Sequence, residues 1–293
     1  MYVGRFAPSP TGPLHFGSLV AAVASYADAR AAKGQWLLRI EDVDTSRCTK
    51  AAEAEILRQL ASYGFEVDSE VVRQSERGEL YAHAVKQLTD TGSVFACTCS
   101  RKMRESAPHN DEGEAIYPGT CRNARHAMAG HSLRLRVTDD GRSLVRFTDR
   151  ACGVISQNVA VDVGDFVLRR ADGLYAYQLA VVVDDALQGV TDIVRGEDLL
   201  MNTPRQIYLQ RALGVATPTY LHVPLVRNVN GEKLSKQTLA AAIRVDAPLE
   251  TLRAAWAFLK QVDVGRADSV AAFWKAAIAA WNPQILRYSQ AVL

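Results

Sequence analysis

The sequence predicts an α/β fold built around a parallel β-sheet, followed by a short helical C-terminal part. Residues 2–6 and 35–40 are short apolar runs typical of strands, and an apolar pattern with helical spacing lies between them. A strand, a helix and a second strand within about 40 residues form a βαβ unit, in which the two strands run parallel. Ligands of such sheets bind at the carboxyl ends of the strands, where Arg5 and Glu41 are expected.

The loop between the first strand and the first helix resembles a phosphate-binding loop. Residues 7–14 contain three prolines and a glycine, which disfavour both helix and sheet. The helix that follows is expected to end at Gly34, as its C′ residue. Its N-terminus presents free N–H groups and the positive end of the helix dipole, which attract phosphate. His15 and Gly17 are therefore candidate nucleotide-binding residues.

The next elements alternate between helix and strand. Helical patterns cover residues 51–63 and 77–88, and both have one apolar face that indicates packing against the core. The apolar run at 175–185 is interpreted as a strand that resumes the parallel sheet, and 192–194 as a further strand. Thr203 is expected to be the N-cap of a helix that reaches residue 213, with Pro204 at its first position.

The segment between the two halves of this sheet differs in character. Stretches with alternating apolar and polar residues at 133–137 and 144–147 predict antiparallel strands, so the segment is interpreted as an insertion. Cys97, Cys99 and Cys121 could hold a tetrahedral zinc with one further ligand, for which the residues alone offer His109 or His126. A closed site of four ligands would be structural.

Composition limits the possible classes of protein. The chain has 293 residues, enough for about two domains, and a formal net charge of +2, which does not require an extended nucleic-acid surface but leaves room for a local basic patch. Five cysteines, an odd number that includes a C-x-C pair, argue against a disulfide scaffold. With no signal-peptide pattern and no apolar run of about 20 residues, a cytoplasmic protein without membrane association is expected.

At the C-terminal end, helical patterns cover residues 249–259 and 270–281. Their aromatic residues are expected to pack in the core and not to stack on bases. These residues are Trp256, Phe258, Phe273 and Trp274. Upstream of them, Lys233 and Lys236 follow the turn-forming pair at 230–231 and could supply a second polyphosphate contact.

Several motifs together resemble the class I glutamyl-tRNA synthetases. They are RFAPSPTGPLHFGS at the N-terminus, RIEDVD at 39–44, RGEDL at 195–199, NTPRQ at 202–206 and KLSK at 233–236. HFGS corresponds to the family's HIGH signature and KLSKQ to its KMSKS signature, in which Gln237 replaces the final serine. The resemblance implies a Rossmann-type catalytic core in two halves, 1–92 and 171–236. It also implies a zinc-containing insertion at 93–170 that receives the acceptor end of tRNA, and a helical region at 237–293.

The resemblance also implies roles for individual residues. Arg5 and Arg195 would hold the carboxylates of glutamate and Glu41 its ammonium, while Tyr177 and Ser9 complete the hydrogen bonding beside Phe6, Ala7 and Pro8. ATP would be bound by His15, Gly17, Lys233 and Lys236, with His15 and Lys236 catalytic and magnesium accompanying the nucleotide. For the zinc, the resemblance points to Tyr117 as the fourth ligand.

The length of the C-terminal region decides between members of this family. The 57 residues from 237 to 293 are fewer than the ~100 or more that an anticodon-binding domain usually needs. The chain therefore resembles family members that transfer activated glutamate to the queuosine base in the anticodon of tRNA(Asp). A minimal synthetase that charges the tRNA 3′ end is the alternative. An inactive paralogue that only binds RNA or a partner is disfavoured by the intact candidate residues Arg5, His15, Glu41, Arg195 and Lys236.

Overall fold

The computed structural model describes residues 1–100, 102–103, 106–110, 113–227 and 241–287. Its first sheet consists of three parallel strands in the order β1-β2-β3: β1 (Val3–Phe6), β2 (Gln35–Ile40) and β3 (Val72–Arg73). Helix α1 (Phe16–Ala31) connects β1 to β2 and is buried along most of its length. The predicted βαβ unit is confirmed.

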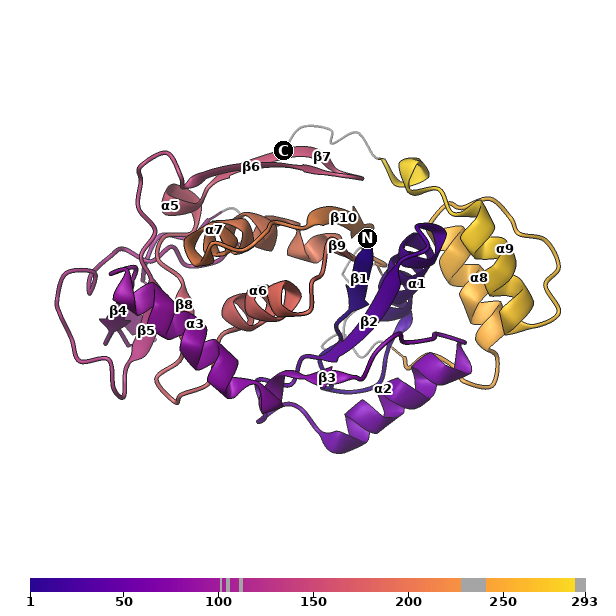
Figure 1. Ribbon diagram of the computed structural model, residues 1–293, viewed down its shortest axis with the longest axis horizontal. Helices are drawn as coiled ribbons and strands as arrows, with labels where there is room; N and C mark the ends of the chain where they lie inside the picture. The colour runs from indigo at the N-terminus through magenta and orange to yellow at the C-terminus, as the bar shows by residue number, and fades with distance from the viewer. Residues whose placement is uncertain (101, 104–105, 111–112, 228–240, 288–293) are drawn as a thin grey trace.

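A second sheet continues this arrangement on the other side of β1. It has the order β7-β6-β10-β9, and its strands are β6 (Leu144–Asp149), β7 (Gly153–Asn158), β9 (Asp192–Gly196) and β10 (Thr219–Val223). Strand β10 pairs in parallel with both β9 and β6. Just before β9, the Thr191 N–H donates to the Val3 carbonyl at 2.9 Å, so β9 lies beside β1 (Figure 1). The β6–β7 hairpin, although it lies within the segment 93–170, thus extends the central sheet.

The third sheet is antiparallel and carries the start of the cysteine pattern. It has the order β4-β5-β8, with strands β4 (Val94–Cys97), β5 (Ser132–Leu135) and β8 (Val167–Arg169). The short helix α5 (Val159–Asp162) lies between β7 and β8 in the chain. Figure 1 shows this sheet at the opposite end of the molecule from the C-terminal helices. The strands predicted at 133–137 and 144–147 are confirmed, but each pairs within a different sheet.

The remaining helices pack against the sheets or, as the two nearest the C-terminus do, against α1. They are α2 (Lys50–Ser62), α3 (Gly78–Asp90), α7 (Thr203–Leu213), α8 (Pro248–Phe258) and α9 (Val270–Ala280), with 3-10 turns η1 (Gln74–Glu76), η2 (Glu197–Asn202) and η4 (Pro283–Leu286). The aromatic side chains Trp256, Phe273 and Trp274 are buried as expected, whereas Phe258 is half-buried against the edge of Phe16. Among the described helices, none combines the length and the apolar character that a bilayer crossing requires.

The strand predicted at 175–185 is wrong. This segment forms helix α6 (Tyr177–Leu187), which is buried on nearly every side. A continuous apolar run does not show a 3.6-residue period, because a helix buried all round has no polar face. The two aspartates at its end, Asp184 and Asp185, are buried too and pair with arginines from other elements. Their charge therefore does not mark a solvent-facing side of the helix.

Two predicted helix caps differ from the structure. The N-cap of α7 is Asn202, and Thr203 lies inside the helix, where its buried hydroxyl accepts from Arg195 Nη2 at 2.7 Å. At the end of α1 the left-handed residue is Lys33, with φ 54°, and not Gly34. Gly34 is required for close packing instead, since a Cβ there would lie 2.5 Å from the Tyr2 carbonyl oxygen.

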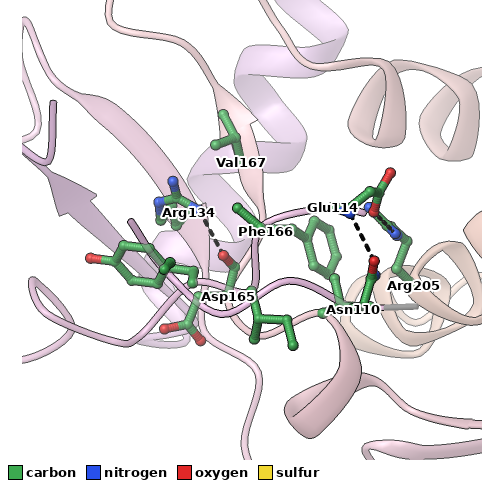
Figure 2. Close-up of a pocket in the computed structure, with 12 residues that line it drawn as sticks. Asn110, Glu114, Arg134, Asp165, Phe166, Val167 and Arg205 are labelled. Atoms are coloured by element: carbon green, nitrogen blue, oxygen red, sulfur yellow. Dashed lines mark hydrogen bonds and ion pairs between the residues drawn. The ribbon is translucent and has the colours of Figure 1, made fainter. Parts of the chain in front are cut away.

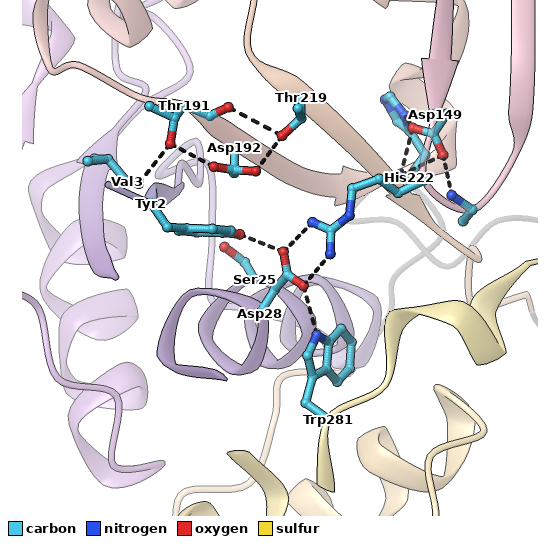
Figure 3. A network of polar contacts seen from close by, with 12 residues as sticks. Tyr2, Val3, Ser25, Asp28, Asp149, Thr191, Asp192, Thr219, His222 and Trp281 are labelled. Carbon is cyan, nitrogen blue, oxygen red and sulfur yellow. Dashed lines mark hydrogen bonds and ion pairs between the residues drawn. The ribbon is translucent and has the colours of Figure 1, made fainter. Parts of the chain in front are cut away.

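A buried carboxylate joins α1 to three distant parts of the chain (Figure 3). Asp28 on α1 accepts from the Tyr2 hydroxyl at 2.6 Å and from Trp281 Nε1 at 2.8 Å. Arg150, at the turn between β6 and β7, holds the same carboxylate with two nitrogens at 2.5 and 2.8 Å. Burial and the negative charge of Asp28 raise the pKa of the Tyr2 hydroxyl far above its usual range, so this hydroxyl remains a donor. Asp28 therefore fixes α1 against the central sheet and the C-terminal segment.

We expect Asp28→Ala to lower the free energy of unfolding by about 3 kcal/mol, because it leaves the Arg150 guanidinium without its buried counter-charge. Urea denaturation at pH 7 measures this. Asp90→Ala is the matched control, because Asp90 forms only an exposed ion pair with Lys86, and it should change stability by less than about 0.5 kcal/mol. Equal effects of the two substitutions would contradict the role given to Asp28.

Candidate active site

A cleft of about 490 Å³ opens where the carboxyl ends of β1, β2 and β9 meet the N-terminus of α1. It gathers predicted site residues from five separate segments of the chain. Those that line it are Arg5, Phe6, Ala7, Pro8, Ser9, His15, Gly17, Glu41, Tyr177 and Arg195. Only Lys233 and Lys236 of the predicted set are not among them, because both lie outside the described residues. The structure thus brings ten of the twelve predicted substrate-site residues to one cavity.

His15 lies at the start of α1, where the sequence places it, and forms the N-cap of this helix. Its Nδ1 accepts from the Ser18 N–H at 3.3 Å. The chain after residue 240 returns to this point, since Ala242 pairs with His15 in an antiparallel bridge and the Ile243 N–H donates to the Leu14 carbonyl at 3.0 Å. The N-terminus of α1 is therefore held between the first loop and the chain that follows residue 240.

Arg5 and Glu41 belong to a buried cluster of charges behind the cleft. Arg5 Nε donates to Asp185 Oδ1 at 3.2 Å, and Arg39 Nη2 lies 2.8 Å from the same oxygen and 3.4 Å from Glu41 Oε1. Burial would raise the pKa of Asp185, but the positive charges of Arg39 and Arg5 outweigh it and lower that pKa. Burial raises the pKa of Glu41, and its two neighbouring arginines only partly oppose this. Glu41 is thus a carboxylate that an additional cation in the cleft would stabilise.

Arg39 and Asp185 were not among the predicted site residues. Arg39 lies in the RIEDVD motif, but its fully buried side chain points away from bulk solvent and contacts Asp185, which the sequence places in a supposed strand. No local pattern could pair them, because 146 positions separate the two residues and only the packing of α6 against β2 brings them together. The only feature of the sequence that could have pointed to Arg39 and Asp185 is that each is a charged residue within or beside an apolar run.

A second cavity of about 350 Å³ adjoins the first. The two share four lining residues, Ser9, Thr11, Glu41 and Tyr177, so they form neighbouring chambers of one depression. The second chamber is also lined by polar residues, among them Asp44, Arg47, Gln74 and Arg170. Its connection to the first gives a molecule bound there access to Tyr177 and Glu41.

Arg195 enters the cleft from β9 and is anchored on its inner side. Its Nε donates to His222 Nε2 at 3.0 Å, and its Nη2 donates to the Thr203 hydroxyl. His222 lies on β10 and contacts Asp149 at the end of β6. Neither residue was predicted as part of the site: β10 is absent from the sequence-based prediction, and Asp149 lies 73 positions from His222, so no local pattern links the two.

The three cysteines of the insertion come together as expected. The sulfur atoms of Cys97, Cys99 and Cys121 all lie within 4.8 Å of one another, so the cluster could hold a metal ion. The Tyr117 hydroxyl lies 3.4 Å from Cys97 Sγ and 3.7 Å from Cys99 Sγ. Although burial opposes it, hydrogen bonds from Thr98 lower the pKa of the Cys121 thiol to about 6, which favours the thiolate that a metal requires.

The two histidines considered as alternative ligands lie apart from this group. His126 Nε2 is 3.3 Å from the Thr98 hydroxyl, and His109 pairs with Ala115 in an isolated antiparallel bridge. Neither completes the cluster of potential metal ligands found among the described residues. The Tyr117 hydroxyl, in contrast, contacts two of the three sulfurs directly.

The cysteine-bearing segment is fixed to the rest of the molecule around a small pocket (Figure 2). This pocket measures about 160 Å³ and lies between the segment and α7. Arg205 on α7 forms an ion pair with Glu114, and Arg134 on β5 donates to the Asp165 carbonyl at 2.7 Å. The Arg134 guanidinium also lies over the Tyr117 ring, 4.0 Å from its centroid. These contacts fix the position of Tyr117 relative to the sheet.

Comparison with known proteins agrees with this geometry. The family model for the catalytic domain of class I tRNA synthetases (E and Q) matches residues 2–253. A glutamyl-Q tRNA(Asp) synthetase of Thiobacillus denitrificans is 58% identical over 242 residues, which are 82% of this chain and 79% of the relative. The protein of the same name from Verminephrobacter eiseniae is 53% identical over 290 residues, 97% of this chain and 98% of the relative.

Solved structures share the fold at lower identity. A glutamate tRNA ligase from Elizabethkingia meningosepticum, crystallised with its amino acid, superposes with a TM-score of 0.80 at 23% identity. The glutamate-tRNA synthetase of Elizabethkingia anophelis gives the same TM-score at 22% identity, and both matches cover 98% of this chain but 66% of the solved chain. With its motifs gathered in one cleft and a family match over most of its length, the chain belongs to the catalytic-domain family of the class I tRNA synthetases for glutamate and glutamine.

Proposed function

We propose that this protein activates L-glutamate with ATP and transfers it to the queuosine base in the anticodon of tRNA(Asp). One structural observation carries the activation step: a single cleft combines two buried arginines, the largely buried carboxylate of Glu41 and the N-terminus of α1. The choice of acceptor is supported by the near full-length identity with glutamyl-Q tRNA(Asp) synthetases.

Glutamate carries two carboxylates and one ammonium, and the cleft offers matching charges. Arg5 and Arg195 bind the carboxylates, because a planar guanidinium can grip a carboxylate with two parallel hydrogen bonds. Glu41 binds the ammonium, whose positive charge offsets the burial that raises the Glu41 pKa. Ser9 and Tyr177 add hydroxyl groups beside the backbone of Phe6, Ala7 and Pro8.

The activation step forms a bond between a glutamate carboxylate oxygen and the α-phosphorus of ATP and expels pyrophosphate. Negative charge grows on the leaving phosphates, so positive groups fixed in advance lower the barrier. His15 and Gly17 provide the N-terminal end of α1, and Lys233 and Lys236 provide cations from the KMSKS-like segment. Magnesium bound to the ATP phosphates supplies further positive charge.

In the transfer step a nucleophilic group of the acceptor attacks the carbonyl carbon of the adenylate, and AMP leaves. The acceptor has to approach on a side of the glutamate that the nucleotide does not occupy. The second chamber, which shares Glu41 and Tyr177 with the first, offers such an approach. Its lining combines apolar side chains with charged ones, among them Asp44, Arg47 and Arg170, and so suits a nucleoside, which has a flat base and polar groups.

We infer further that the cysteine cluster holds a structural zinc ion with Tyr117 as its fourth ligand. For zinc–sulfur and zinc–oxygen bonds of about 2.3 and 2.0 Å, tetrahedral geometry puts neighbouring ligand atoms about 3.5 to 3.8 Å apart. The distance from Cys99 Sγ to Cys121 Sγ is 3.6 Å, and the two distances to the Tyr117 hydroxyl, 3.4 and 3.7 Å, are close to this range. Four protein ligands leave no position for substrate, so the ion would stabilise the insertion.

The acceptor is tested with labelled glutamate, ATP, magnesium and tRNA(Asp), with and without queuosine. We expect label on the queuosine-containing tRNA alone, and we expect it to persist when the 3′-terminal adenosine has been removed beforehand, because the base is the acceptor. A parallel reaction contains tRNA(Glu). If glutamate is transferred to tRNA(Glu), and removal of the 3′-terminal adenosine abolishes this transfer, the protein is a minimal synthetase instead. If the wild-type protein catalyses no glutamate-dependent exchange of pyrophosphate into ATP, the proposed activation step is wrong.

We expect Arg5→Lys to raise the KM for glutamate about tenfold in pyrophosphate exchange, because lysine keeps the charge but loses the planar fork. Arg58→Lys is the matched control, since Arg58 forms an exposed pair with Glu55, and it should leave the KM unchanged. An unaltered KM in Arg5→Lys would mean that Arg5 serves only to neutralise Asp185.

Zinc content separates the possible ligands. We expect Cys121→Ser to lose zinc and Tyr117→Phe to bind it more than about tenfold more weakly, while Cys48→Ser and His126→Asn keep the wild-type content. Elemental analysis of purified protein and competition with a chelator measure these changes. Loss of zinc in His126→Asn but not in Tyr117→Phe would assign the fourth position to the histidine.

A further inference from the structure

One nitrogen of Arg195 has no partner in the part of the chain that the structure describes. Nε donates to His222 and Nη2 to Thr203, whereas Nη1 has no hydrogen-bond partner among the residues that the structure describes. Arg195 is only 5% exposed and lines the cleft. A buried charged nitrogen without a partner is costly, and a ligand carboxylate would remove this cost.

The contact with His222 determines where the imidazole carries its proton. An arginine Nε–H can only donate, so His222 Nε2 must accept and the proton must be on Nδ1. Nδ1 lies 2.7 Å from Asp149 Oδ2, which is an acceptor for it. This tautomer is assigned from the hydrogen-bond network. Burial lowers the pKa of His222, and the positive charge of Arg195 lowers it further. Asp149 and Asp198 act in the opposite direction but do not outweigh these effects, so the ring is neutral at pH 7.

Asp149 is itself fixed by the backbone. Its Oδ1 accepts from the N–H groups of Ala151 and Cys152, both at 2.9 Å, and its Oδ2 accepts from the His222 N–H at 3.1 Å. These donors and the His222 ring lower the Asp149 pKa, although its burial acts in the opposite direction. The carboxylate is therefore ionised and can only accept hydrogen bonds. Figure 3 shows Asp149 beside His222.

We propose that Asp149 and His222 are positioning residues which hold Arg195 with its Nη1 directed to a carboxylate of the substrate. The proposal rests on glutamate being that substrate. Asp149 selects the Nδ1–H tautomer, His222 then accepts from Arg195 Nε, and Thr203 accepts from Nη2. Three strands, β6, β10 and β9, carry the three members of this series. A histidine that only filled space in the core would not need one particular tautomer.

Asp149→Asn tests the tautomer with an isosteric change. The Asn carbonyl oxygen would take the position that faces the Ala151 and Cys152 N–H groups, so its NH₂ would face His222 Nδ1. Nδ1 of His222 would then accept a hydrogen bond, and its proton would move to Nε2. Two donors, the His222 Nε2–H and the Arg195 Nε–H, would then face each other and could not form a hydrogen bond. We expect kcat/KM for glutamate to fall about 10- to 100-fold, mainly through KM, while the KM for ATP changes less than about twofold.

Two substitutions of His222 separate its contact with Asp149 from its contact with Arg195. The shorter amide in His222→Asn can still donate to Asp149 but cannot reach Arg195, and we expect the same rise in KM for glutamate. The longer amide in His222→Gln can place its oxygen near Arg195 Nε, and we expect it to restore most of the affinity. His83→Asn, on the exposed face of α3, is the matched control and should behave as wild type.

The outcomes are decisive even if a variant does not fold. Nitrogen-15 NMR of the wild-type protein reads the tautomer directly, and a proton on Nε2 of His222 would overturn the proposal. Folded Asp149→Asn and His222→Asn proteins with unchanged KM for glutamate would overturn it as well. A wild-type protein that does not activate glutamate would reject the proposed function, whereas the NMR result would still test the contact between His222 and Arg195.

Discussion

Two consecutive residues at the end of β6 link the elements that enclose the cleft. Asp149 holds His222 on β10, which in turn holds Arg195 on β9, and the neighbouring Arg150 binds Asp28 on α1. Each of these contacts is buried or half-buried and joins a charged group to a matched partner. Because unpaired buried charges are costly, the cleft is held in the arrangement that pairs them.

The same requirement explains the composition of the cleft itself. Asp185 neutralises both Arg5 and Arg39, and Arg39 also contacts Glu41, so the cluster is nearly balanced without a ligand. The groups that remain open to a ligand are a carboxylate with a raised pKa and an arginine nitrogen with no partner in the described part of the chain. A zwitterionic amino acid with an additional carboxylate complements both.

Sequence reasoning succeeded where a pattern is local. The first βαβ unit, the position of His15 at the start of α1 and the C-x-C pair are each encoded by short local patterns, and all were found as expected. It was wrong at α6, because a helix buried on all sides and a buried strand have the same continuous apolar composition. It also placed the β6–β7 hairpin in the insertion, since pairing of β6 with β10 depends on residues about 70 positions away.

The sequence by itself therefore determined the class of fold, the motifs and the types of residue available for binding, since these depend on composition and short spacing. Only the tertiary structure decided that Asp185 neutralises Arg5, that Tyr117 and not His126 lies beside the cysteines, and that Thr203 holds Arg195 instead of capping a helix. These contacts join different elements of the fold, and their partners are selected by the burial of charge and the packing of those elements, which no local pattern records.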